Sequence, residues 1–209
     1  MLGPPGSGKG TRAHIISELY GIPVITTGDM LREAVAKGTE YGKIAGGYMS
    51  RGELVPDEIV NGVVGERLGM SDLENGFILD GFPRSAPQAE FLDSFLEEHG
   101  LKLDHVIHVT LDDEAIVKRL SNRRSCPSCG EVYHLVSMPP KKEGVCDKCS
   151  SELVLRDDDR PSVIRNRLEV YREKTQPLLK KYRDKGLMRE VPGDYPLDQL
   201  QEQLKRILG

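Results

Sequence analysis

The sequence predicts an α/β fold in which helices flank a parallel sheet. Short apolar stretches alternate along the chain with longer segments of helical periodicity, which is the pattern of consecutive βαβ units. A glycine-rich turn near the start leads directly into the first helical segment. The 209 residues are enough for one substantial core with insertions, or for two small domains.

The glycine-rich turn is Gly3-Pro4-Pro5-Gly6-Ser7-Gly8-Lys9-Gly10-Thr11, which fits the G-x4-G-K spacing of a phosphate-binding loop. Its glycines let backbone N–H groups face a phosphate, and Lys9 and the following helix N-terminus add positive charge. Gly10 follows the lysine, so the hydroxyl that usually contacts Mg²⁺ is displaced to Thr11. We expect a nucleotide site here. Only Met1 and Leu2 precede the turn, so we expect its supporting strand to be nearly missing or truncated, at a cost in stability.

Periodicity, helix-start residues and glycine stops define the remaining elements in order. Thr26-Thr27-Gly28-Asp29 is a helix-start signal, and Pro161 suits a first helical position. Helices are expected at residues 9–19, 30–36, 41–49, 57–68, 85–99, 112–122, 161–182 and 197–207, with a kink at Pro177. Strands are expected at residues 24–25, 76–79, 106–109 and 187–191.

Residues 122–159 interrupt this alternation with cysteines, prolines and turn residues. Cys126-x2-Cys129 and Cys146-x2-Cys149 are separated by 16 residues, a spacing that matches a closed tetrahedral zinc site. Two disulfides or a redox C-x-x-C are alternatives, although a cytoplasmic chain disfavours the first and the second leaves one pair unexplained. We expect a structural zinc that folds a segment too short for its own core.

Several arginines lie at expected loops and hinges. They are Arg32, Arg84, Arg119, Arg123, Arg124, Arg156, Arg165 and Arg167. Each alone fits a solvated surface charge, but as a set around a phosphate loop they indicate a cage for a second anionic substrate.

Asp80 ends a buried strand, at the sheet edge where α/β proteins bind ligands, and can hold water around Mg²⁺. The run 157–159 of three aspartates either does the same or caps and solvates a hinge.

The net charge of −4 argues against a general nucleic-acid binder. No apolar run approaches the roughly 20 residues of a membrane span, and no signal-like segment is present. We therefore expect a cytoplasmic protein without a membrane partner.

With these residues in view, the chain resembles the adenylate kinases of the long-lid, zinc-containing bacterial type, within the nucleoside monophosphate kinases. The shared motifs are residues 3–11, Thr27-Gly28-Asp29-Met30-Leu31-Arg32, Asp80-Gly81-Phe82-Pro83-Arg84, Val132-Tyr133-His134 and Arg156-Asp157-Asp158 with Arg167. The resemblance implies a P-loop kinase core, a helical monophosphate-binding insertion and a zinc-ribbon-like lid. The implied division is core 1–25, AMP-binding insertion 26–55, core 56–121, zinc lid 122–159 and core 160–209.

The resemblance also implies a monomeric enzyme that converts ATP and AMP into two ADP with Mg²⁺. The implied ATP-binding residues are Gly6, Ser7, Gly8, Lys9, Gly10, Thr11, Arg119, Arg123, Val132, Tyr133 and Tyr195. The implied AMP-binding residues are Thr27, Arg32, Glu53, Leu54, Val55, Gly81, Phe82, Pro83, Arg84, Gln88, Arg156 and Arg167. The implied catalytic residues are Lys9, Arg84, Arg123, Arg156 and Arg167. Asp80 is expected to hold Mg²⁺ through water, and the Gln88 amide suits the donor and acceptor edge of adenine.

Two other functions fit parts of the pattern. One is a kinase of the same fold that acts on UMP or CMP or uses GTP, which the long cysteine lid and Gln88 disfavour. The other is a nucleotide-gated zinc-ribbon binding module without phosphoryl transfer, which predicts affinity for nucleic acid and no ADP from ATP plus AMP.

Overall fold

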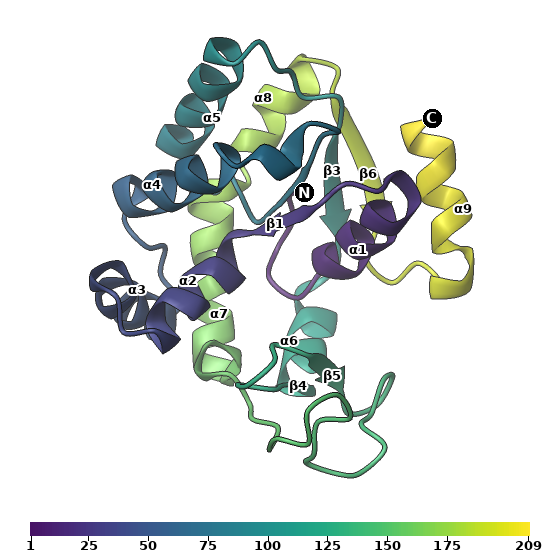
Figure 1. Cartoon of the computed structure of the whole chain (residues 1–209). Coiled ribbons are helices and arrows are strands. Elements are labelled where there is room, and N and C mark those ends of the chain that lie inside the picture. The colour runs from purple at the N-terminus through teal and green to yellow at the C-terminus, as the bar shows by residue number, and fades with distance from the viewer.

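The computed structural model describes residues 1–209 and confirms the α/β prediction (Figure 1). The core strands are β1 (Val24–Thr26), β2 (Ile78–Asp80), β3 (Val106–Thr110) and β6 (Met188–Pro192). β1 pairs in parallel with β2, and β3 pairs in parallel with β6. The four strands occupy the positions expected from the apolar stretches, shifted by at most two residues at either end.

The first two residues connect these two strand pairs. Leu2 donates its N–H to Ile107 O and accepts from Val109 N, both at 2.8 Å, while the Met1 amine donates to Leu79 O at 2.7 Å. The chain start therefore lies between β2 and β3, in the place of the central strand that the glycine-rich turn normally follows. In this place Leu2 forms an isolated parallel bridge with His108.

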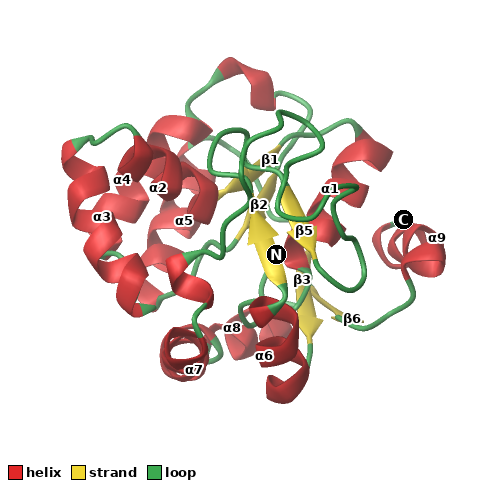
Figure 2. Cartoon of the chain, turned by 90° about the horizontal axis from the view of Figure 1, so that it is seen from below, coloured by secondary structure: helices red, strands yellow, loops and turns green.

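Helices cover the strands on both sides (Figure 2). They are α1 (Lys9–Tyr20), α2 (Thr27–Ala36), α3 (Glu40–Arg51), α4 (Asp57–Leu68), α5 (Ala86–Glu98), α6 (Asp113–Ser121), α7 (Pro161–Val170), α8 (Leu178–Asp184) and α9 (Leu197–Leu208). No helix combines the length and the apolar character needed to cross a bilayer.

The helical segment expected at residues 161–182 is present and is broken at Pro177 as expected, but it is not one continuous α-helix. After α7 the chain makes a π-helix, Tyr171–Thr175, and α8 begins after Pro177. The wider turn closes with a hydrogen bond from Gln176 N to Tyr171 O, and Thr175 then donates its hydroxyl to Arg84 O at 2.7 Å. A periodicity of 3.6 averaged over a helix does not reveal such a turn, because a single π-helical turn spans only a few residues.

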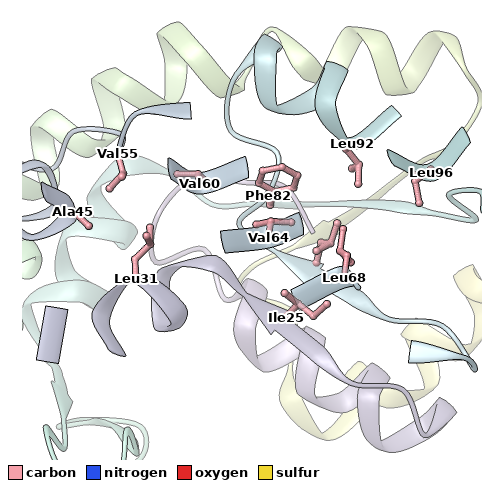
Figure 3. Packing of buried hydrophobic residues seen from close by; sticks show 11 residues of the cluster. Ile25, Leu31, Ala45, Val55, Val60, Val64, Leu68, Phe82, Leu92 and Leu96 are labelled. Atoms are coloured by element: carbon pink, nitrogen blue, oxygen red, sulfur yellow. The ribbon is translucent and has the colours of Figure 1, made fainter. Parts of the chain in front are cut away.

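Two buried clusters position the functional segments. One joins α2, α4 and α5 through residues that include Leu31, Val60, Val64, Phe82 and Leu92 (Figure 3). The other fixes α1 against β3, β6 and α9 through residues that include Ala13, Ile16, Val109, Val191 and Leu204.

The insert at 122–159 projects from the core beyond α6 (Figure 1). It contains the antiparallel strands β4 (Arg123–Ser125) and β5 (Val132–His134). Its small buried cluster consists of Cys126, Cys146, Tyr133 and Leu153, so its interior is built largely around thiols.

Candidate functional site

The glycine-rich turn forms the start of α1. Gly8 is the N-cap, with a left-handed φ of 96° at which a Cβ would lie 2.6 Å from Arg12 Nη1. Lys9 Nζ donates to the carbonyl oxygens of Gly3 at 2.9 Å and Pro4 at 2.8 Å, so one N–H of the ammonium remains for a phosphate oxygen. The turn thus presents a helix N-terminus and a lysine at one point.

Lys9 lies in a buried and predominantly cationic environment. Burial is the main cause that lowers the pKa of Lys9 to about 8, and the charges of Arg84, Arg167 and Arg123 lower it further. Asp80 opposes this shift. The predicted lysine and three of the predicted arginines are therefore close enough in space to interact electrostatically.

Asp80 is buried at the carboxyl end of β2, beside the glycine-rich turn. Its Oδ1 has no hydrogen-bond partner, and a Cβ at Gly10 would lie 3.6 Å from its Oδ2. A buried, unpartnered carboxylate oxygen beside a phosphate loop fits the donor chemistry of a hydrated Mg²⁺ ion.

Two aspartates hold the arginines at the two ends of the insert. Arg123 forms a two-pronged pair with the fully buried Asp159, with N···O distances of 2.7 and 2.6 Å. Arg167 Nη1 lies 3.1 Å from both Asp158 Oδ2 and Asp159 Oδ1. Burial raises the pKa of Asp158, but the nearby arginines, led by Arg167, outweigh it and hold that pKa below its usual value.

Arg156 and Arg84 complete this cluster. Arg156 Nε donates to Ser125 Oγ at 3.1 Å, and Arg84 Nε donates to Gly81 O at 2.7 Å. Burial lowers the pKa of each guanidinium to about 10, so both are cationic at neutral pH.

The residues expected on the AMP side surround the end of β2. The buried Thr27 hydroxyl donates to Gly81 O at 2.8 Å, which ties the start of α2 to the Asp80-to-Arg84 segment. Phe82 and Val55 are core residues, so their side chains are buried in the cluster of Figure 3. Arg32 and Glu53 are half-buried and paired locally, Arg32 with Asp29 and Glu53 with Arg51.

The residues expected on the ATP side divide between the core and the insert. Arg119 donates to Gly6 O and Gly193 O, each at 3.3 Å, so it links the glycine-rich turn to the loop that carries Tyr195. Tyr133 lies in the insert, and its hydroxyl contacts Asp147 N at 2.8 Å and Cys146 Sγ at 3.5 Å. Tyr133 is buried, and its neighbour Val132 on β5 is half-buried.

The four cysteines converge although the sequence separates them. Their sulfur atoms all lie within 4.8 Å of one another, with Cys126 to Cys149 at 3.3 Å and Cys129 to Cys146 at 3.5 Å. Zn–S bonds of about 2.3 Å place tetrahedral thiolates about 3.8 Å apart, so this cluster has the dimensions of a four-thiolate metal site. All four thiols are free, which excludes disulfides from this structure.

Arg12 was not predicted as a site residue, although it is 1% exposed. Its guanidinium donates to Gly8 O at 3.2 Å and to Pro192 O at 2.7 Å, so it links the glycine-rich turn to the end of β6. The available signal was its position three residues after Lys9, on the same side of a helix.

A parallel α/β sheet with a lysine-bearing phosphate loop and converging arginines defines a nucleotide-binding phosphotransferase. Comparison with known proteins identifies the family. A family model described as adenylate kinase matches residues 1–187. The chain therefore belongs to the adenylate kinase family.

Relatives named adenylate kinase match along the whole chain. The protein of Archaeoglobus fulgidus is 55% identical over 208 residues, which cover 100% of this chain and 96% of the relative. Those of Oceanobacillus iheyensis and Thermodesulfovibrio yellowstonii are each 51% identical over 208 residues, covering 100% of this chain and 97% of each relative.

Proposed function

We propose that this chain transfers the terminal phosphoryl group of MgATP to AMP and so produces two ADP molecules, in a reversible reaction. The observation that carries the proposal is that Asp80 lies beside the turn with Lys9, Arg84 binds Gly81 O next to Asp80, and Arg123 and Arg167 share Asp159. Phosphoryl transfer requires positioned positive charge rather than covalent chemistry from the protein, and this arrangement supplies it.

In the proposed reaction, an oxygen of the AMP phosphate forms a bond to the γ-phosphorus of ATP. The bond from that phosphorus to the β-phosphate oxygen breaks, and ADP carries away the electron pair. Lys9 and the α1 N-terminus hold the ATP phosphates, while Arg84, Arg156 and Arg167 hold the AMP phosphate. Arg123, at the hinge of the insert, stabilises charge on the group in transit.

Asp80 would hold Mg²⁺ through water, and the bound ion would neutralise charge on the phosphate oxygens. Cys126, Cys129, Cys146 and Cys149 would hold zinc as a purely structural ion, because four thiolates fill a tetrahedral shell. Free thiols also suit a reducing compartment, so we propose that the protein is cytoplasmic. We further propose that it is a monomer and does not act on nucleic acid.

We further propose that residues 26–55 and 122–159 are mobile insertions on a core formed by 1–25, 56–121 and 160–209. Their closure over AMP and ATP would exclude water and suppress hydrolysis of ATP. The support is that both segments project from the core in Figure 1, one through α2 and α3 and the other beyond α6.

The experiment is a coupled assay for ADP from ATP plus AMP, repeated with UMP, CMP and GMP as acceptors and GTP as donor. We expect ADP only when Mg²⁺ is present, and the fastest rate with ATP and AMP. A faster rate with UMP or CMP would instead support a pyrimidine monophosphate kinase. Nucleic-acid binding without ADP formation would support a zinc-ribbon binding module.

A further inference from the structure

The Gln88 amide is hydrogen-bonded on both sides within the protein. Its Oε1 accepts from the backbone N–H of Arg84 at 2.8 Å, and its Nε2 donates to Asp57 Oδ1 at 2.8 Å. Gln88 lies in the first turn of α5 and is only 1% exposed. The Gln88 amide is therefore held between two polar groups, the backbone N–H of Arg84 and the carboxylate of Asp57.

These neighbours allow one orientation of the amide. A backbone N–H only donates and a carboxylate only accepts. If the amide were turned by 180°, its NH₂ group would face the Arg84 N–H and its oxygen would face the Asp57 carboxylate. Both hydrogen bonds would be lost and like partial charges would oppose each other, so Oε1 must face Arg84 and Nε2 must face Asp57.

Asp57 is itself held in place. Its Oδ1 accepts a hydrogen bond from Ser85 Oγ at 2.7 Å, and Ser85 Oγ in turn caps α5 by accepting from Gln88 N. Asp57 is the first residue of α4, where the helix dipole favours a carboxylate. α4 packs on α5 through the buried cluster in Figure 3, so the two helix starts form one unit.

The orientation decides which bases the amide can pair with. Each amide group has one hydrogen-bonding position left: a second N–H on Nε2 and a second lone pair on Oε1. Adenine offers an acceptor at N1 and a donor at its 6-amino group, which match these positions. Hypoxanthine and guanine offer a donor at N1 and an acceptor at O6, which match only the reversed amide.

We propose that Asp57 is a positioning residue that fixes the Gln88 amide so that the site accepts a 6-aminopurine monophosphate and rejects a 6-oxopurine monophosphate. This inference rests on the proposed function, with AMP bound at Gln88. The base reaches the buried amide when residues 26–55 move. A 6-oxopurine then leaves buried polar groups unpaired, and sites of this kind discriminate strongly.

The first test uses the unaltered protein. Dissociation constants are measured for AMP, for purine riboside 5′-monophosphate, which lacks any group at C6, and for IMP, which carries O6. A fixed amide predicts the affinity order AMP, then purine riboside monophosphate, then IMP, because IMP opposes the amide whereas purine riboside only loses one partner. IMP binding as tightly as purine riboside monophosphate, or more tightly, would overturn the proposal.

The second test uses Asp57→Asn, which keeps the side-chain size but can either donate or accept. We expect the ratio of kcat/KM for AMP to that for IMP to fall about tenfold, through a higher KM for AMP and a lower KM for IMP. The kcat with AMP should stay within about threefold. The backbone N–H of Arg84 still favours the original orientation of the Gln88 amide, so the preference for AMP over IMP becomes smaller but does not reverse.

Two comparisons isolate the role of Asp57. Glu58→Gln removes a charge from the same first turn of α4 and should leave the ratio unchanged, since Glu58 is exposed. In a Gln88→Ala background, Asp57→Asn should have no further effect on the ratio, because Asp57 acts through Gln88. A parallel loss with both nucleotides, or an equal effect without Gln88, would overturn the proposal. Absence of ADP formation by the unaltered protein would instead refute the proposed function.

Discussion

Lys9 is the residue whose burial and charged neighbours affect the proposed phosphoryl transfer most directly. Its ammonium is held by two carbonyl oxygens of the turn and interacts with nearby arginines. It is therefore oriented before a nucleotide binds. A preorganised charge of this kind stabilises developing charge without reorganisation during the reaction.

Replacing Lys9 with alanine should therefore lower kcat/KM by about 10²- to 10³-fold, or about 3–4 kcal/mol of transition-state stabilisation, as for other preorganised donors. The measurement is the initial rate of ADP formation. Lys205→Ala, which removes an exposed lysine of α9 that pairs with Glu202, is the matched control and should retain full activity. Full activity in Lys9→Ala would remove the phosphate loop from the mechanism.

The lowered pKa of Lys9 also predicts the alkaline limit of activity. Below pH 8 the free protein carries a charged Lys9 that attracts phosphate, and above it the amine becomes neutral. The value of kcat/KM for ATP reports the free enzyme, so it should fall as pH rises, with an apparent pKa of about 8.

Lys9→Arg provides the control for this pH profile, because a guanidinium keeps its charge over the same range. Its residual activity should lack the decline near pH 8. If kcat/KM of the unaltered protein for ATP stays constant up to pH 10, deprotonation of Lys9 does not set the alkaline limit of activity.

Among the elements, the insert at 122–159 is the one whose stability we expect to depend most on a bound ion. Its buried cluster has two cysteines among its four members, so little apolar surface supports its fold. A metal held by the four thiolates would supply the missing free energy.

Chelation under reducing conditions should release about one zinc per chain and lower the melting temperature by about 5–10 °C, which corresponds to a few kcal/mol in a protein of this size. Metal analysis and calorimetry provide the two measurements. Cys149→Ser should show a similarly low melting temperature that chelation hardly changes. Protein that contains no metal, or that melts unchanged after chelation, would contradict this role.

Elements with a local signature were predictable from the sequence, and contacts between elements were not. The phosphate turn and the paired cysteines depend on short spacings, and the structure brings each group together as expected. Three features arise from packing between distant segments. They are the π-helix at 171–175, the hydrogen bonds from Arg12 to Gly8 O and Pro192 O, and the hydrogen bond from Gln88 to Asp57. The last joins residues 31 positions apart, and each residue alone reads as an ordinary helix-start residue.

At the scale of the whole molecule, the site is assembled from segments that differ in their attachment to the core. α1 is fixed by the cluster that it shares with β3, β6 and α9. α3 contributes Ala45 to the cluster in Figure 3, and its end reaches α7 through a hydrogen bond from Asn166 to Arg51 O. Gly52 ends α3 with a left-handed φ of 74°, close to Arg167 and Val163. The proposed closure would therefore act on segments outside the sheet.

Hydrogen–deuterium exchange tests this division. AMP should slow exchange of backbone amides in residues 26–55, and a non-hydrolysable ATP analogue should slow it in residues 122–159, because each ligand orders the segment that covers it. Amides of β3 and β6 serve as internal reference and should change little. Equal protection along the whole chain would show that the molecule responds as one body.

The pairing of Asp158 and Asp159 with Arg123 and Arg167 has a consequence for turnover. The aspartates use only part of each guanidinium, because no hydrogen bond involves Arg123 Nη1 or the Nε and Nη2 of Arg167. A phosphate can therefore bind the remaining N–H groups while the aspartates keep both guanidinium planes oriented. The paired carboxylates also offset part of the positive charge of the cluster, which would weaken its attraction for ADP when ADP departs.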